Sequence, residues 1–201
     1  MSTRYASAAA RSASSKPFVG PATKEALLLY VDTCDLAELK ECVAMGLCAG
    51  VTTNPLIIVR ESEGADLKQR ITALIEIARA PTSVEVTSES ESEMLREARE
   101  YHSWDREHVV IKVPMSLAGL KVARALEREK IPVNLTCLMS FNQAYLAAHA
   151  GATYVSLFAG RIKDMGYDVT SVIADTRKLI DREGWRTKII VGSIRHLMDV
   201  N

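Results

Sequence analysis

The chain has 201 residues, of which 48% are hydrophobic, with 25 basic and 25 acidic side chains. This composition is typical of one large globular domain. The zero net charge offers no electrostatic surface for nucleic acid or an anionic membrane, and no apolar run approaches the roughly 20 residues that span a bilayer, so we expect neither partner.

The first 24 residues differ from the rest of the chain. They are rich in serine and contain Arg4, Arg11 and Lys16, whereas the first acidic residue is Glu25 and no apolar core of a secretory signal is present. Such a segment is typical of a disordered tail and also of an organellar transit peptide. We therefore expect one barrel domain at residues 25–201, in the cytoplasm or, through residues 1–24, in a plastid or mitochondrion.

The cysteines and histidines follow no metal-ligand spacing. Cys34, Cys42, Cys48 and Cys137 form no CxxC pair, and no Cys/His cluster has zinc spacing. We interpret the cysteines as reduced thiols of an intracellular protein, with packing as their default role, and we predict no metal site.

Short apolar runs alternate with amphipathic stretches along the chain. The apolar runs predict seven strands, at residues 27–32, 50–54, 83–86, 109–114, 132–136, 154–158 and 188–193. The amphipathic stretches predict helices at residues 35–44, 66–78, 90–101, 117–129, 140–150 and 169–183. Strands that alternate with helices indicate repeated βαβ units and therefore an α/β protein with a parallel sheet.

These units fit a (β/α)8 TIM-type barrel better than a dinucleotide-binding sheet, because no GxGxxG segment follows any predicted strand. Asn201 follows the seventh predicted strand by about eight residues, whereas a further strand and helix need a few tens of residues. We therefore expect this chain to lack the eighth strand and the C-terminal helix, which leaves two strand edges unpaired.

Lys112 stands inside the predicted strand at residues 109–114, which is otherwise apolar. Burial disfavours the charged form of an amine, and a neutral amine can form a Schiff base with a carbonyl substrate. A lysine at the end of a strand can also reach solvent with its amine while its stem packs, so the strand alone does not decide between these readings.

Every other predicted strand also ends in or carries a polar side chain. In parallel barrels the carboxyl ends of the strands meet at one face, which is where the chemistry takes place. Because side chains alternate along a strand, Thr52 and Asn54 share one face, as do Asn134 and Thr136. Seven polar strand ends that converge in this way predict a lined binding site.

Individual residues of this set have simpler alternatives. Asp32 can cap the following helix, although Thr33 or Asp35 would serve as well. Glu85 lies between two valines, where burial without a partner is unfavourable, or at an exposed strand end. Arg161 and Arg195 follow the last two predicted strands and either form surface ion pairs or clamp an anion such as phosphate.

In their order and spacing, these motifs resemble those of the small class I transaldolases and the closely similar fructose-6-phosphate aldolases. The resemblance covers about residues 28–197, and its most specific segment is Gly-Val-Thr-Thr-Asn-Pro at residues 50–55. The other segments are Val31-Asp32-Thr33, Val84-Glu85-Val86, Ile111-Lys112-Val113-Pro114, Asn134-Leu135-Thr136, Gly160-Arg161-Ile162 and Gly192-Ser193-Ile194-Arg195.

The resemblance implies a role for each matching position. Lys112 is implied to be the Schiff-base lysine and Asp32 the acid/base for the C4 hydroxyl proton. Glu85 and Thr136 are implied to hold a water that shuttles protons during carbinolamine dehydration. The implied ligands of the dihydroxyacetone unit are Asn54, Asn134 and Ser156, with Thr52 and Phe158 beside them, and those of the distal phosphate are Arg161, Ser193 and Arg195.

Two positions favour the transaldolases within this family. Family aldolases have Gln and Tyr where this chain has Glu85 and Phe158. A tyrosine hydroxyl helps to protonate the enamine and release dihydroxyacetone, whereas Phe158 leaves the enamine to wait for an acceptor aldehyde.

We therefore expect a transaldolase that transfers a dihydroxyacetone unit from fructose 6-phosphate or sedoheptulose 7-phosphate to an aldose phosphate, in the pentose phosphate pathway. The resemblance implies no metal or organic cofactor, because the protonated imine is the electron sink. It also implies a homo-oligomer for a chain with a complete C-terminus. A fructose-6-phosphate aldolase and a non-catalytic, incomplete barrel that binds sugar phosphate remain alternatives.

Overall fold

The computed structural model describes residues 28–62 and 64–200, so the expected N-terminal extension at residues 1–24 lies outside the described part of the chain. Seven parallel strands form one sheet in which each strand pairs with the next one along the chain. The strands are β1 (Tyr30–Asp32), β2 (Gly50–Thr52), β3 (Thr82–Glu85), β4 (Val109–Pro114), β5 (Val133–Leu138), β6 (Tyr154–Phe158) and β7 (Lys188–Gly192).

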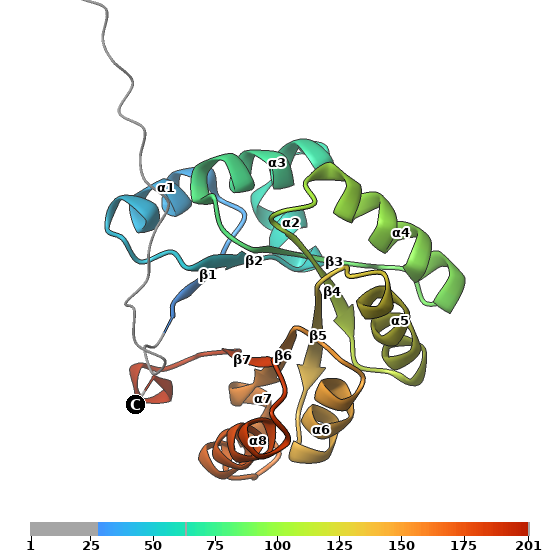
Figure 1. The fold of residues 1–201 in the computed structure, drawn as a ribbon. Helices are drawn as coiled ribbons and strands as arrows, with labels where there is room; N and C mark the ends of the chain where they lie inside the picture. The colour runs from blue at the N-terminus through green and yellow to red at the C-terminus, as the bar shows by residue number, and fades with distance from the viewer. Residues whose placement is uncertain (1–27, 63, 201) are drawn as a thin grey trace, which may run out of the picture.

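The sheet curls into an incomplete barrel with its helices on the outside (Figure 1). Within the described residues β1 does not pair with β7, so the barrel is open between these two strands. The predicted TIM-type barrel without an eighth strand is therefore confirmed.

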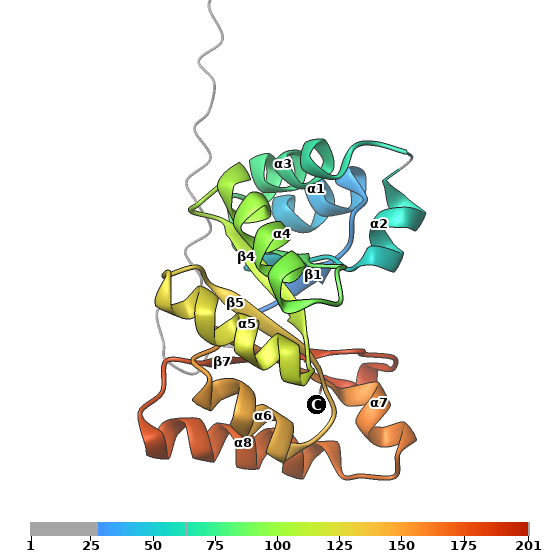
Figure 2. The same ribbon diagram turned by 90° about the vertical axis from the view of Figure 1, so that its right-hand side faces the viewer.

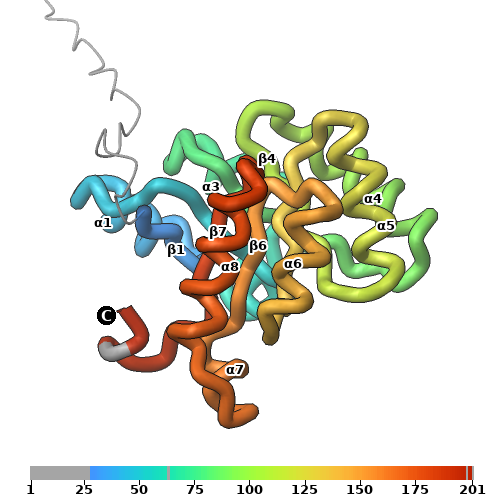
Figure 3. Tube along the Cα trace, turned by 60° about the horizontal axis from the view of Figure 1, so that its bottom comes forward, coloured from blue at the N-terminus to red at the C-terminus, as the bar shows by residue number. Residues whose placement is uncertain are grey.

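The outer helices lie where the amphipathic stretches predict them, and each begins after an Asp or Ser side chain that accepts hydrogen bonds from the first-turn amides. They are α1 (Leu36–Ala44), α3 (Leu67–Ala78), α4 (Glu91–Trp104), α5 (Leu117–Arg128), α6 (Phe141–His149) and α8 (Val169–Glu183). Helix α6 packs against β6 and lies beside α8 (Figure 3).

The sequence pattern did not predict three short elements of the described chain, namely α2 (Pro55–Glu61), α7 (Ala159–Asp164) and a 3₁₀ turn (Leu197–Asp199). Leu56 and Val59 of α2 are 72% and 81% exposed, so α2 has no simple apolar inner face. Helix α7 is too short for a helical period to be recognised. Because α2 follows β2 directly and α7 follows β6, both lie at the carboxyl end of the barrel (Figure 2).

Alternation along the strands separates a packing face from a polar face. Ile111, Val113 and Leu135 are fully buried within the hydrophobic core, which includes residues of the outer helices. Lys112 and Asn134, one position away, instead make polar contacts with other strands. The barrel interior is therefore polar at the level of Lys112.

Tyr30 begins β1 and contacts Tyr154 at the start of β6. Its hydroxyl donates to the hydroxyl of Tyr154 at 3.2 Å, which joins β1 to β6. Gly50 makes room for this ring, because a Cβ at position 50 would lie 2.2 Å from it.

No helix in the described part of the chain has the length and apolar character needed to cross a membrane.

Candidate active site

Lys112 lies in the middle of β4 and is 6% exposed. Its Nζ is 3.1 Å from Oε2 of Glu85 on the neighbouring strand β3 and donates to the backbone carbonyl of Thr53 at 2.9 Å. The lysine therefore does not reach solvent from a strand end. The carboxylate of Glu85 offsets the penalty of burying an amine that can carry charge.

Thr53 is a site residue that the sequence did not predict. It follows β2 and is fully buried; both its N–H (3.1 Å) and its hydroxyl (2.8 Å) donate to the carbonyl of Ser83. Its contact with Lys112 uses a backbone oxygen, which every residue type carries. No sequence pattern could therefore have indicated it.

A buried chain of hydrogen bonds crosses the interior beside Lys112. Ser156 Oγ donates to Asn134 Oδ1 at 2.7 Å, and Asn134 Nδ2 donates to Ser83 Oγ at 3.2 Å. The three side chains are between 0% and 4% exposed. The structure thus brings the predicted Asn134 and Ser156 together, and it adds Ser83, which fixes the orientation of the Asn134 carboxamide.

Asp32 lies at the end of β1, on the open side of the barrel, and is exposed. Thr52 Oγ1 donates to Asp32 Oδ1 at 2.7 Å. Asp35, and not Asp32, caps α1, which decides one alternative left by the sequence. The carboxamide oxygen of Asn54 caps α2 by accepting from Ile57 N–H at 3.0 Å, so this predicted substrate ligand already has a structural role.

Thr136 and Cys137 lie at an irregularity in β5, where the register with β6 shifts between Leu135 and Leu138. Thr136 is fully buried, and its hydroxyl has no hydrogen-bond partner among the described residues. Cys137 adopts a left-handed backbone conformation with φ of 62°.

This irregularity places the Cys137 thiol near the charged pair. Burial raises the pKa of the thiol and the nearby Glu85 carboxylate raises it further, while Lys112 and the neighbouring Thr136 hydroxyl, which makes no hydrogen bond of normal geometry, oppose the shift. Cys137 therefore stays a protonated, weakly nucleophilic thiol at neutral pH. Strict alternation would have placed it on the packing face, so the sequence missed it.

The predicted phosphate ligands gather where β7 ends beside α7. Asp164 joins the two arginines, because it accepts from Arg195 Nη1 at 2.8 Å and lies 3.8 Å from Arg161 Nη1. The hydrogen bond from Arg195 lowers the pKa of the Asp164 carboxyl. Gly160 allows this approach, since a Cβ there would lie 2.6 Å from both Arg195 Nε and the Ser193 carbonyl oxygen.

Phe158 ends β6 and is half-buried, with α7 beginning at the next residue.

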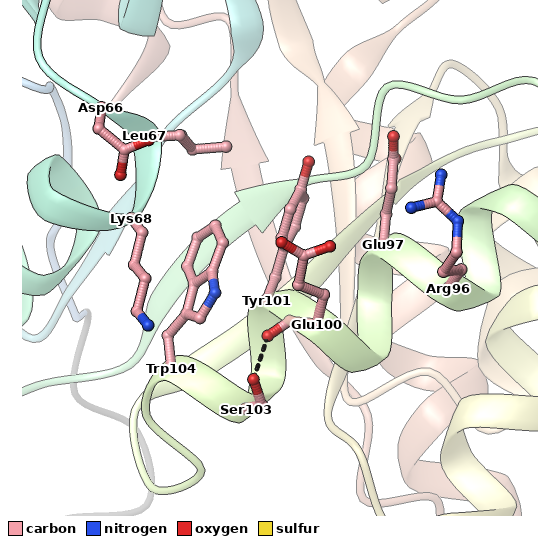
Figure 4. Close-up of a pocket in the computed structure, with 9 residues that line it drawn as sticks. All are labelled: Asp66, Leu67, Lys68, Arg96, Glu97, Glu100, Tyr101, Ser103 and Trp104. Atoms are coloured by element: carbon pink, nitrogen blue, oxygen red, sulfur yellow. Dashed lines mark hydrogen bonds between the residues drawn. The ribbon is translucent and has the colours of Figure 1, made fainter.

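A groove that is unrelated to the predicted site residues lies on the outer surface between α3 and α4 (Figure 4). Charged side chains of both signs line it around Trp104, and none of the predicted site residues does. No group of three or more His, Cys, Asp or Glu residues in the described chain is arranged to hold a metal ion.

Comparisons with known proteins show which family the chain resembles over most of its length. A model of the family described as Transaldolase/Fructose-6-phosphate aldolase matches residues 29–201. A relative named "Probable transaldolase" from Kosmotoga olearia is 41% identical over 172 residues, which cover 86% of this chain and 78% of the relative. Another of that name from Maridesulfovibrio salexigens is 43% identical over 171 residues, covering 85% and 78%.

A solved structure shows the same fold at much lower sequence identity. Orotidine 5'-monophosphate decarboxylase from Methanocaldococcus jannaschii, solved with the inhibitor BMP, has a TM-score of 0.61 and 8% identity, covering 86% of this chain and 82% of that one. This likeness concerns the barrel alone. The family model spans nearly all of the described barrel, and the curated relatives match over most of their own length. The chain therefore belongs to the transaldolase and fructose-6-phosphate aldolase family.

Proposed function

We propose that this protein is a transaldolase, which transfers a dihydroxyacetone unit from a ketose phosphate to an aldose phosphate through a Schiff base on Lys112. The observation that carries the proposal is the position of the Lys112 amine. It is buried in the middle of a strand, between the Glu85 carboxylate and the Thr53 carbonyl, at the level where the interior turns polar. Family membership supports the same class of reaction.

The first step is attack of the neutral amine on the ketose carbonyl. A new C–N bond forms as the carbonyl π bond breaks; the amine gives up one proton and the carbonyl oxygen gains one, which makes the hydroxyl of a carbinolamine. This hydroxyl takes a second proton and leaves as water, so that a protonated imine remains. In this proposal Glu85, whose carboxylate is 3.1 Å from Lys112 Nζ, and the buried hydroxyl of Thr136 act through a water on this dehydration. The hydrogen bonds of Asn134 and Ser156 prepare two polar groups for the hydroxyls of the dihydroxyacetone unit.

The second step breaks the bond between C3 and C4 of the ketose. Asp32 takes the proton of the C4 hydroxyl, the aldose phosphate leaves, and the electron pair moves into the imine to form an enamine. The enamine then adds to the acceptor aldehyde by the reverse steps. Arg161, Ser193 and Arg195 supply the positive charge and the hydroxyl that the phosphate of either aldose requires.

Incubation of the purified chain with fructose 6-phosphate and borohydride, followed by peptide mass spectrometry, tests this proposal. Reduction fixes the imine, so we expect a reduced dihydroxyacetone adduct on Lys112 and none in the Lys112→Met variant, which keeps an unbranched side chain without an amine. No adduct on a wild-type chain that circular dichroism shows to be folded would contradict a Schiff-base enzyme.

The exposure of Asp32 at the open side of the barrel favours a second candidate, namely a barrel that binds sugar phosphate without turnover. Ketose phosphate binding without an adduct would support it. Free dihydroxyacetone formed in the absence of an acceptor would instead support the aldolase. Transfer that depends on added aldose phosphate would support the transaldolase, which Glu85 and Phe158 favour.

A further inference from the structure

The amine of Lys112 is held by a backbone oxygen as well as by a carboxylate. The form of an amine that attacks a carbonyl is the neutral one, which has two N–H groups and one lone pair around a tetrahedral nitrogen. Glu85 Oε2 at 3.1 Å and the Thr53 carbonyl oxygen at 2.9 Å are two acceptors for the two N–H groups. With both N–H groups held, the lone pair takes the one remaining direction, so these acceptors decide where Lys112 can attack.

The Thr53 carbonyl is itself held in place by the Thr53 side chain. Position 53 comes directly after the last residue of β2, so its peptide lies outside the strand. The Thr53 hydroxyl donates to the carbonyl of Ser83 on β3 at 2.8 Å and adds a second restraint to the Thr53 N–H bond to the same oxygen at 3.1 Å. These contacts are fully buried, so water does not compete with them.

We infer that Thr53 is a positioning residue. Its hydroxyl, by donating to Ser83 on β3, holds the Thr53 carbonyl in place, and this carbonyl in turn aims the Lys112 amine. This inference rests on the proposed Schiff-base function, because it concerns the same amine. Thr53 touches neither the reacting carbon nor the substrate in this scheme. The Thr53 side chain acts through the Thr53 backbone oxygen, which no substitution removes. Loss of the hydroxyl therefore makes the position of the Lys112 amine less fixed, while both of its acceptors remain.

The structure allows a clean substitution at this position. Thr53→Val keeps the volume and the branched Cβ and removes only the hydroxyl. The Ser83 carbonyl keeps its hydrogen bond from the residue 53 N–H, so the variant leaves no buried acceptor without a partner. Thr53→Ser restores the hydroxyl. Thr82→Val is the matched control, since the Thr82 hydroxyl is equally buried and donates to the Ala80 carbonyl at 3.1 Å, at the opposite end of β3 from Glu85.

The test is the rate of borohydride-trapped adduct formation on Lys112 as a function of fructose 6-phosphate concentration. We expect Thr53→Val to lower the maximal rate on the order of tenfold, with the half-saturating concentration unchanged, because binding groups remain and only the aim of the amine is lost. Thr53→Ser and Thr82→Val are expected to match the wild type. If Thr53→Val does not fold, Thr53→Cys, whose thiol is a weak donor, carries the same comparison.

The outcomes separate this inference from the proposed function. A wild-type adduct together with an undiminished rate in Thr53→Val overturns the positioning role and leaves the Schiff base standing. An equal loss in Thr82→Val also overturns it, since the effect would then follow any buried hydroxyl. A wild type that forms no adduct overturns the proposed function, and the inference with it.

Discussion

Thr136 combines full burial with a hydroxyl that has no partner among the described residues. Leaving a buried hydroxyl unsatisfied costs about 1–3 kcal/mol, so such groups are rare in folded proteins and call for a functional reason. Two residues from Asn134 on the same strand, Thr136 is suited to bind a water or a reaction intermediate that arrives with the substrate. We therefore expect the Thr136 hydroxyl to lower the stability of the free protein and to serve the proposed reaction.

Replacement of Thr136 by valine is expected to separate these two properties. Thr136→Val keeps the shape and removes the unsatisfied group, so the free energy of unfolding should rise by about 1 kcal/mol. The rate of adduct formation should fall about a hundredfold, because proton transfer loses a participant. Urea unfolding and borohydride trapping measure the two effects.

Thr187→Val provides the matched comparison for Thr136→Val. The Thr187 hydroxyl is also buried but donates to the Ala152 carbonyl at 2.8 Å, so its removal should lower the free energy of unfolding by about 1 kcal/mol. If both valine variants lose stability equally, the Thr136 hydroxyl has a partner in the resting protein and the argument from burial fails.

At the scale of elements, an aromatic ring of β1 fills the space that a side chain at Gly50 of β2 would occupy. The Tyr30 ring occupies the space in front of Gly50, its register partner, and reaches Tyr154 on β6 with ring centroids 6.0 Å apart. Desolvation by burial raises the pKa of the Tyr30 hydroxyl, as does its hydrogen bond with Tyr154. This contact ties β1, a strand of three residues with one neighbour, to the other half of the barrel.

Gly50→Ala is expected to lower the free energy of unfolding by about 1–3 kcal/mol, because the new Cβ overlaps the Tyr30 ring and forces β1 to shift. Thermal or urea unfolding measures the loss. In a Tyr30→Leu background the same substitution should cost less, since the clash is then relieved. Gly192→Ala is the control: its Cβ would make an ordinary 3.7 Å contact with Phe158, so stability should change by less than about 0.5 kcal/mol. Equal losses at both glycines would argue against the ring clash.

At the scale of the whole molecule, the barrel has two strand edges that face each other across its open side (Figure 1). The hydrogen bond from Lys188 N–H to Thr153 shows which residues of β7 face β6. Because N–H groups alternate in direction along a strand, those of Ile189 and Val191 face the opening. Unpaired edges favour pairing with other chains, which a charged residue such as Lys188 opposes.

Amide hydrogen exchange is expected to resolve this alternation within β7. The N–H groups of Ile189 and Val191 should exchange at least about a hundredfold faster than that of Ile190, which points toward β6. The neighbouring strand β6, paired on both sides, supplies protected amides for comparison. Equal and strong protection along β7 would mean that a further segment or a second copy of the chain pairs with its open edge.

The periodic parts of this protein follow from its sequence. The bounds predicted for β4, β6 and α8 agree with the structure. The reason is that the apolar pattern of a buried strand or an amphipathic helix continues over the whole length of the element. The polar strand ends were also expected to converge, and the structure brings Lys112 together with Glu85, and Asn134 together with Ser156. Whether each of them has its implied catalytic or binding role stays a prediction.

Only the tertiary structure decided which groups surround the Lys112 amine. Thr53 contacts the amine through a backbone oxygen. Ser83 belongs to the chain of hydrogen bonds beside it, and Cys137 comes near through a shift in the register of β5. None of these leaves a periodic signal, because each depends on how separate strands are set against one another as the sheet curls. The physical reason is range: side-chain alternation is local, whereas the groups that contact the Lys112 amine come from residues 27 and 59 positions away along the chain.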